Sequence, residues 1–114
     1  MKRIELLNKL IKLEEPVGII TKKLEEYGWD SPCDLVTLKR ENLLNILNLY
    51  IEGKLKDTEV EDWANAIESR EDIGAENGSK ELIEESIYEL ANPYLTENLT
   101  STRAKILREK LVKN

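Results

Sequence analysis

Two stretches of the chain carry carboxylates at helical spacing. In residues 60–71 (VEDWANAIESRE), Glu61, Asn65 and Glu68 stand at i, i+4 and i+7 with Asp62 beside them. In residues 80–90 (KELIEESIYEL), Glu81 is followed by Glu84 and Glu85 at intervals of three and four. Side chains at these intervals share one face of a helix. Such a face attracts the Lys and Arg side chains of a protein partner, or holds a divalent cation where its oxygens converge. The candidate partner-binding residues are Glu61, Asp62, Glu68, Glu81, Glu84, Glu85 and Tyr88.

Tyr88 is the one aromatic residue in this set, and the pattern turns it outward among glutamates. A tyrosine combines an apolar ring with a polar hydroxyl and is enriched at protein interfaces. We expect the carboxylates to act mainly on the association rate and its salt dependence, and a desolvated tyrosine to govern dissociation. The two stretches together therefore predict a protein-binding surface.

Catalytic and metal chemistry finds little support in the composition. The chain has no His and a single cysteine, Cys33. Ser-His and Cys-His pairs are therefore impossible, and a zinc site lacks ligands. We expect no enzymatic activity, no cofactor and no metal. A remote alternative is a carboxylate site for Mg²⁺ or Ca²⁺ formed by Glu81, Glu84 and Glu85, although no EF-hand spacing or phosphate loop accompanies it.

Charge is segregated along the chain. Residues 57–97 contain thirteen Asp and Glu against two Lys and Arg, a balance of −11, whereas residues 1–56 carry +1 and residues 98–114 carry +4. With a pI near 4.8 and no basic stripe, the chain is not expected to bind nucleic acid. The acidic centre instead predicts a basic protein partner.

Two alternatives to partner binding stay open. Acidic helix faces are often merely solvated, and the chain would then be a structural or oligomerisation module. Alternatively, the basic last helix lies across the acidic faces and neutralises them. The oligomeric state does not follow from the sequence.

Helix-forming residues dominate, and Gly and Pro are scarce. One domain spanning residues 1–114 is expected, all-α, as a compact bundle of five to six short helices. Short strands at 34–37 and 72–76 are a weaker alternative. The first predicted helix runs from Lys2 to Leu13, and the second runs from Pro16 to a stop at Gly28, followed by a connector at residues 29–36. The third runs from a cap at Thr37 to Tyr50 or Ile51, and the fourth from a capping box at Thr58 to Ser69 or Arg70. The fifth runs from a cap at Ser79 to Asn92-Pro93, and the sixth begins at Ser101 or Thr102.

Arg70 follows the buried stripe of the fourth predicted helix. If this helix continued, Glu71 would fall on the buried stripe, where an unpaired carboxylate is too costly. We therefore expect the helix to end before Glu71, and Arg70 to close the edge of the core by pairing with Glu71, Asp72 or an acid of the next helix. The stripe consists of Val60, Ala64 and Ile67, with Trp63 at its edge.

No apolar run approaches the roughly 18–20 residues of a membrane span. Glu5, Lys9 and Lys12 interrupt the apolar residues at the start of the chain, so we read no export signal there. A single cysteine excludes an internal disulfide and is typical of a reducing compartment. These features favour a cytoplasmic protein without a membrane partner. The basic positions of the first helix (Lys2, Arg3, Lys9 and Lys12) also suit an anionic membrane, but a core-facing amphipathic helix has the same pattern.

Four segments carry a resemblance: Tyr50-Ile51-Glu52-Gly53, Val60-Glu61-Asp62-Trp63-Ala64, Arg70-Glu71-Asp72-Ile73 and Leu90-Ala91-Asn92-Pro93. Over about residues 37–95 the chain resembles small acidic helical bacterial proteins of the toxin-immunity type, including those of contact-dependent inhibition. It is also similar in logic to the colicin DNase immunity proteins, although their sequence motif is absent and no residue is carried over. The resemblance implies a binder that neutralises a basic toxin, for example a nuclease.

Overall fold

The computed structural model describes residues 2–28 and 30–113, so Trp29 of the predicted connector lies outside the described residues. Helices make up most of the described chain, and two three-residue strands form a small sheet. The predominantly all-α prediction is therefore confirmed. The elements are α1 (Lys2–Lys12), α2 (Val17–Leu24), the 3₁₀ turn η1 (Glu25–Tyr27), β1 (Val36–Leu38), α3 (Arg40–Ile51), α4 (Asp57–Glu68), β2 (Ile73–Ala75), α5 (Lys80–Ala91) and α6 (Ser101–Lys113).

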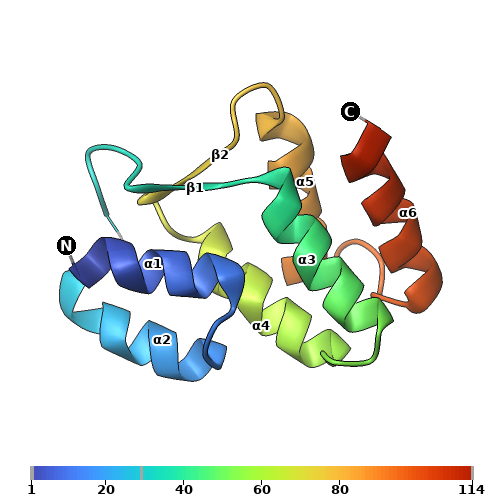
Figure 1. Cartoon of the computed structure of the whole chain (residues 1–114), viewed down its shortest axis with the longest axis horizontal. Coiled ribbons are helices and arrows are strands. Elements are labelled where there is room, and N and C mark those ends of the chain that lie inside the picture. The colour runs from blue at the N-terminus through green and yellow to red at the C-terminus, as the bar shows by residue number, and fades with distance from the viewer. Residues whose placement is uncertain (1, 29, 114) are drawn as a thin grey trace.

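The helices pack as three pairs. α1 lies beside α2 at one end of the molecule, α3 lies beside α6 at the other, and α4 packs against α5 (Figure 1). Each helix buries the stripe that its apolar spacing predicts, such as Ala104, Leu107 and Leu111 on α6. Within the described residues, no helix has the length and apolar character needed to cross a membrane.

Trp63 belongs to this core. Its side chain is 0% exposed, so the residue predicted at the edge of the stripe is buried as fully as Val60 and Ala64. The indole Nε1–H donates a 2.8 Å hydrogen bond to the carbonyl of Leu10, which satisfies the one polar atom that burial would otherwise strand. Leu10 lies in the last turn of α1, and its carbonyl also accepts the Leu13 N–H at 3.1 Å. The bond from Trp63 therefore fastens α4 to the end of α1.

The structure contains two short strands near 34–37 and 72–76, where the sequence predicted strands only as a weaker alternative. β1 and β2 pair in parallel, with Val36 opposite Ile73 and Leu38 opposite Ala75. Two parallel strands cannot be joined by a tight turn, and here the crossover consists of α3 and α4. Val36 and Leu38 are buried and Thr37 is exposed, which is the alternation of a strand with one face on the core.

Two predicted helix starts are wrong. Thr37 lies in β1, and α3 begins three residues later, where the side chain of Asn42 accepts the Lys39 N–H at 2.8 Å. Thr58 lies inside α4, because Glu59 reaches back to the Lys56 N–H at 2.9 Å. In both cases the residue three positions after the cap supplies the acceptor, as in half of a capping box.

The second helix is shorter than predicted, because α2 ends at Leu24 and η1 fills the interval to Gly28, whereas other helix limits agree with the sequence. α4 ends at Glu68 before Arg70, α5 ends before Asn92-Pro93, and α6 begins at Ser101. Gly28 has a φ of 71°, as expected of a left-handed stop. Ser79 stands at the cap of α5, but its hydroxyl accepts a hydrogen bond from Arg40 Nε at 2.6 Å instead of capping the helix.

Candidate functional site

The acidic faces of α4 and α5 point away from the shared core, as the helical spacing predicts. Six of the seven candidate residues are exposed, and Glu61 is half-buried. Tyr88 exposes 47% of its surface, which is high for a large aromatic side chain. Five of the seven residues line three different hollows of the molecule, and the other two line none of these.

Glu68, Glu84 and Tyr88 line a groove beside β2, here named the β2 groove. It has a volume of about 720 Å³ and lies between β2, the end of α4 and the outward face of α5. Exposed acids outnumber exposed bases in its wall. The charged side chains that line it are Asp34, Glu68, Arg70, Glu71, Lys80 and Glu84, of which Arg70 is buried.

Asn92 connects the two helices at one end of this groove. Its Nδ2 donates to Glu68 Oε2 at 3.0 Å and to the Tyr88 carbonyl at 2.9 Å. The amide thereby holds a carboxylate of α4 next to the last turn of α5. Glu68 and Tyr88 are the candidate pair whose relative position is fixed by a hydrogen-bonding residue.

Glu61 lies around a different hollow. This hollow has a volume of about 180 Å³, lies where α4 meets the α5–α6 connection, and includes Glu89 and Glu97. Arg103 of α6 pairs with both of these acids, at 2.7 Å to Glu89 Oε2 and 2.8 Å to Glu97 Oε2. Negative charge around Glu61 is therefore partly neutralised within the molecule.

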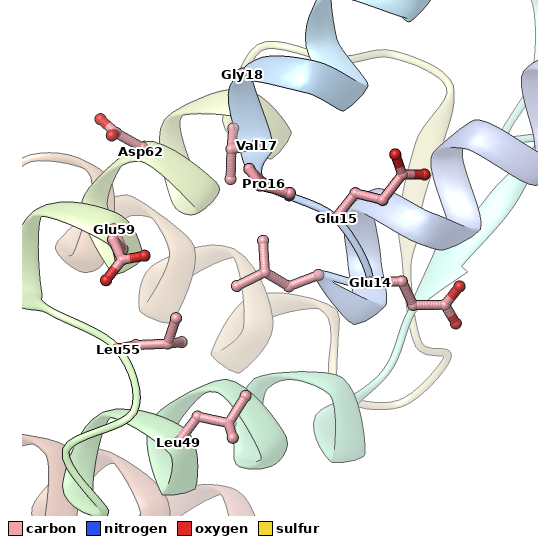
Figure 2. Close-up of a pocket in the computed structure, with 10 residues that line it drawn as sticks. Glu14, Glu15, Pro16, Val17, Gly18, Leu49, Leu55, Glu59 and Asp62 are labelled. Atoms are coloured by element: carbon pink, nitrogen blue, oxygen red, sulfur yellow. The ribbon is translucent and has the colours of Figure 1, made fainter.

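Asp62 lies in a third place, at a hollow of about 450 Å³ between the α1–α2 turn and the α3–α4 connection. Figure 2 shows Val17, Leu49 and Leu55 turned into this space, whereas the carboxylates of Glu14 and Asp62 point away from it. The hollow thus combines apolar side chains with the carboxylate of Glu59, while Glu14 and Asp62 lie at its rim. Asp62 and Tyr88 therefore line different hollows.

Glu81 and Glu85 are exposed on α5 and line none of these three hollows. The basic α6 does not lie across them, since it packs beside α3 (Figure 1). Its Arg108 reaches Asn48 of α3 at 3.0 Å. The last helix therefore does not cover Glu81 and Glu85 of α5, whereas its Arg103 neutralises Glu89, also on α5, near Glu61.

A second cluster of charged groups is buried at the start of β2, here named the Asp72 clamp. Asp72 is 0% exposed and receives Arg70 Nε on Oδ1 at 2.9 Å and Arg70 Nη2 on Oδ2 at 3.0 Å. Arg3 Nη2 also donates to Oδ2 at 2.9 Å. The spare guanidinium N–H groups bond the carbonyls of Gly28 and Asp30. The cluster ties α1, the turn after η1 and β2 together.

Burial and hydrogen bonding act in opposite directions on Asp72. Burial raises the pKa of its carboxyl, but hydrogen bonds and the positive charges of Arg70 and Arg3 outweigh burial and lower this pKa overall. Nearby, hydrogen bonding to Asp30 raises the pKa of the Glu71 carboxyl. Asp72 stays ionised with its lone pairs occupied, so it is a structural acceptor and not a base.

The clamp was predicted only in part. The sequence pattern predicts Asp72 as one of three possible partners of Arg70, but it predicts no partner for Arg3, which it places among the basic positions of a core-facing amphipathic helix. Arg3 is instead half-buried against Asp72, 69 positions away. The contact between Arg3 and Asp72 depends on where the strand at 72–76 packs, and the weak strand pattern of these residues does not predict that position.

Other chemistry-bearing groups stay apart. Within residues 2–28 and 30–113, no three side chains among His, Cys, Asp and Glu come together in a way that would hold a metal ion. Glu81, Glu84 and Glu85 therefore form no cation site there. Cys33 is exposed in the loop before β1.

Comparison of the chain with protein-family models, with curated proteins and with solved structures gave no match.

Proposed function

We propose that the chain is a protein-binding module that docks a basic protein partner through the β2 groove. The partner we infer is a toxin, for example a nuclease, that the chain neutralises in the manner of an immunity protein. The observation that carries the proposal is the convergence of Glu68, Glu84 and Tyr88 on one groove in which Lys80 is the single exposed base. Ordinary soluble surfaces mix the two signs more evenly.

The division of labour follows from exposure. Glu68 and Glu84 are solvated and attract Lys or Arg of the partner over several ångströms, which raises the association rate at low salt. Tyr88 supplies a ring that loses water only in the complex, so it acts mainly on dissociation. Glu81 and Glu85 extend the acidic field along α5 outside the groove. Glu61 and Asp62 contribute less, because each lies around another hollow.

The test is a charge reversal with a matched control. The double variant Glu68→Lys, Glu84→Lys is compared with Glu25→Lys, Glu26→Lys, which changes the net charge equally at exposed residues of η1. Candidate partners are captured with the wild-type chain, identified, purified and measured one by one. We expect the groove variant to weaken binding by about a hundredfold and the control to change it by less than about threefold.

The biological arm uses neutralisation. Co-expression with the identified partner should restore growth with the wild-type chain and with the control variant, but not with the groove variant. Equal protection by both variants, with circular dichroism showing that both are folded, would exclude the β2 groove as the docking surface.

A structural or oligomerisation module is the second candidate, and one observation favours it. Tyr94 and Leu95, in the α5–α6 connection, expose 93% and 72% of their surfaces. Adjacent exposed apolar side chains suit a contact between copies. Sedimentation at several concentrations tests this candidate: self-association abolished by Leu95→Glu supports it, and a strict monomer contradicts it.

A further inference from the structure

Strand β2 has one paired edge and one open edge. In the ladder, the Val36 N–H donates to the Asp72 carbonyl at 3.2 Å, and the Glu76 N–H donates to the Leu38 carbonyl at 2.9 Å. Between these two bonds, a parallel ladder turns the main-chain groups of Gly74 toward β1. Its two neighbours in the strand are turned the other way.

These neighbours are Ile73 and Ala75, and their outward groups are unpaired. No hydrogen bond joins the main-chain N–H or C=O of either residue to another described part of the chain. Both residues line the β2 groove, a space of about 720 Å³ that α5 borders on the other side, so a chain laid along this edge of β2 would lie at the groove. An unpaired strand edge is a ready template for another extended chain.

We propose that an extended segment of a basic protein pairs with this edge of β2 as a third strand. The inference rests on the proposed function, and it names the main-chain mode by which the groove holds its partner. Two N–H and two C=O groups, from Ile73 and Ala75, supply hydrogen bonds, while side chains along the groove select the sequence.

Charge complementarity selects a basic segment. Alternate side chains of a third strand would meet the carboxylates of Glu68, Glu71 and Glu84 on the groove wall. The carboxylate of Asp34 lies directly against the α-carbon of Gly74, where any larger residue would displace it. A neighbouring strand would therefore meet a further acid at the middle of β2, which favours Lys or Arg there.

The same charges disfavour a second copy of this chain. Pairing two copies edge to edge would bring two acidic grooves together, and like charges placed opposite each other are destabilising. The outer edge of β1 is a poorer template, since α1 packs against β1 and Thr37 does not line the groove.

The experiment uses two synthetic peptides of eight residues and equal charge, acetyl-(Lys-Val)₄-amide and acetyl-(Lys-Pro)₄-amide. The first forms strands, and the second cannot, because proline lacks the N–H and breaks the ladder. Amide resonances of the folded chain are followed by NMR during titration. We expect the Lys-Val peptide to bind about tenfold more tightly and to slow hydrogen exchange of the Ile73 and Ala75 amides about tenfold.

Two proline variants provide the matched pair. Ala75→Pro removes an N–H on the open edge of β2, and Thr37→Pro removes one on the far edge of β1, so neither removes a bond of the ladder. We expect the first to weaken binding of the Lys-Val peptide about tenfold and the second to leave it within about twofold. If Ala75→Pro fails to fold, strand addition is tested by the comparison of the two peptides on the wild-type chain.

Each outcome separates the two proposals. Equal binding of both peptides, without protection of Ile73 and Ala75, would overturn strand addition while leaving the docking of basic proteins intact. Absence of binding by the Lys-Val peptide would also overturn strand addition. The proposed function would then be tested separately by the charge-reversal variants and their effect on partner binding. Binding by an acidic (Glu-Val)₄ peptide as tight as that of the Lys-Val peptide would overturn the preference for a basic segment.

Discussion

Arg3 donates two hydrogen bonds to a single oxygen of Asp72, from Nε at 3.1 Å and from Nη2 at 2.9 Å. Arg70 reaches both oxygens of the same carboxylate from the other side. The first helix is thereby held against the start of β2 by charge as well as by its apolar face. A carboxylate shared by two guanidinium groups is geometrically demanding, so its removal has large consequences.

Asp72→Asn is expected to destabilise the fold by about 3–5 kcal/mol at neutral pH. The substitution keeps the shape of the side chain but leaves two partly buried arginines without their counter-charge, which is the costly way to break a buried pair. Urea unfolding followed by circular dichroism measures the change. Glu5→Gln serves as the control, because Glu5 is exposed on α1 and should cost less than about 0.5 kcal/mol.

The advantage of the wild type over Asp72→Asn should depend on pH. The folded-state pKa of Asp72 lies below its ordinary value of 3.8, so its contribution is fully present above 3.8 and is lost as pH falls through the folded-state pKa. Unfolding curves of the two proteins should therefore converge below pH 3.8. A difference that stays constant down to strong acid would show that Asp72 is not paired as an anion.

Trp63→Phe is expected to cost about 1–3 kcal/mol, because the buried hydrogen bond from the indole to the Leu10 carbonyl is lost, and this carbonyl keeps only the Leu13 N–H as a donor. A further loss comes from the smaller ring in a fully buried position. Thermal unfolding measures the sum. Tyr50→Phe is the comparison: Tyr50 is only half-buried and its hydroxyl donates to the Leu99 carbonyl at 3.2 Å, so it should cost less.

Arg103→Gln should loosen the α5–α6 connection at a cost of about 1–2 kcal/mol. Arg103 binds Glu89 through Nε and Nη2, both at 2.7 Å, in a fork that lysine cannot reproduce. Arg103→Lys should therefore recover only part of the loss. Lys105→Gln on the same helix is exposed and should be close to neutral. High salt should reduce the Arg103 effect, and an effect independent of salt would point to lost packing instead.

Helix existence followed from the sequence because each helix buries a periodic stripe. Positions such as Val60 and Ala64 on α4, or Leu107 on α6, repeat at intervals that only a helix places on one face. Helix starts were harder to predict. Thr37 and Thr58 have capping side chains, yet the acceptors that act are Asn42 and Glu59, whose choice depends on where the preceding chain enters.

The sequence predicted which candidate residues are exposed, but it did not predict which of them line the same hollow. A helical wheel turns Glu61, Asp62 and Glu68 outward together, and all three belong to one helix of twelve residues. Their neighbours decide the rest: α5 and β2 flank Glu68, the α5–α6 connection flanks Glu61, and the α1–α2 turn flanks Asp62. Such long-range packing is not encoded in the periodicity of one element.

The hydrogen bonds that close this fold join distant parts of the chain. Leu10 bonds Trp63 across 53 positions, Arg3 bonds Asp72 across 69, and Arg40 bonds the Leu111 carbonyl across 71. A nascent chain must therefore be extended past Asp72 before α1 gains its charged partner, and to Leu111 before α3 gains its last bond. α2 packs against α1 early, but α1 gains its charged partner only later, so we expect the domain to complete its folding only after Leu111 has been synthesised.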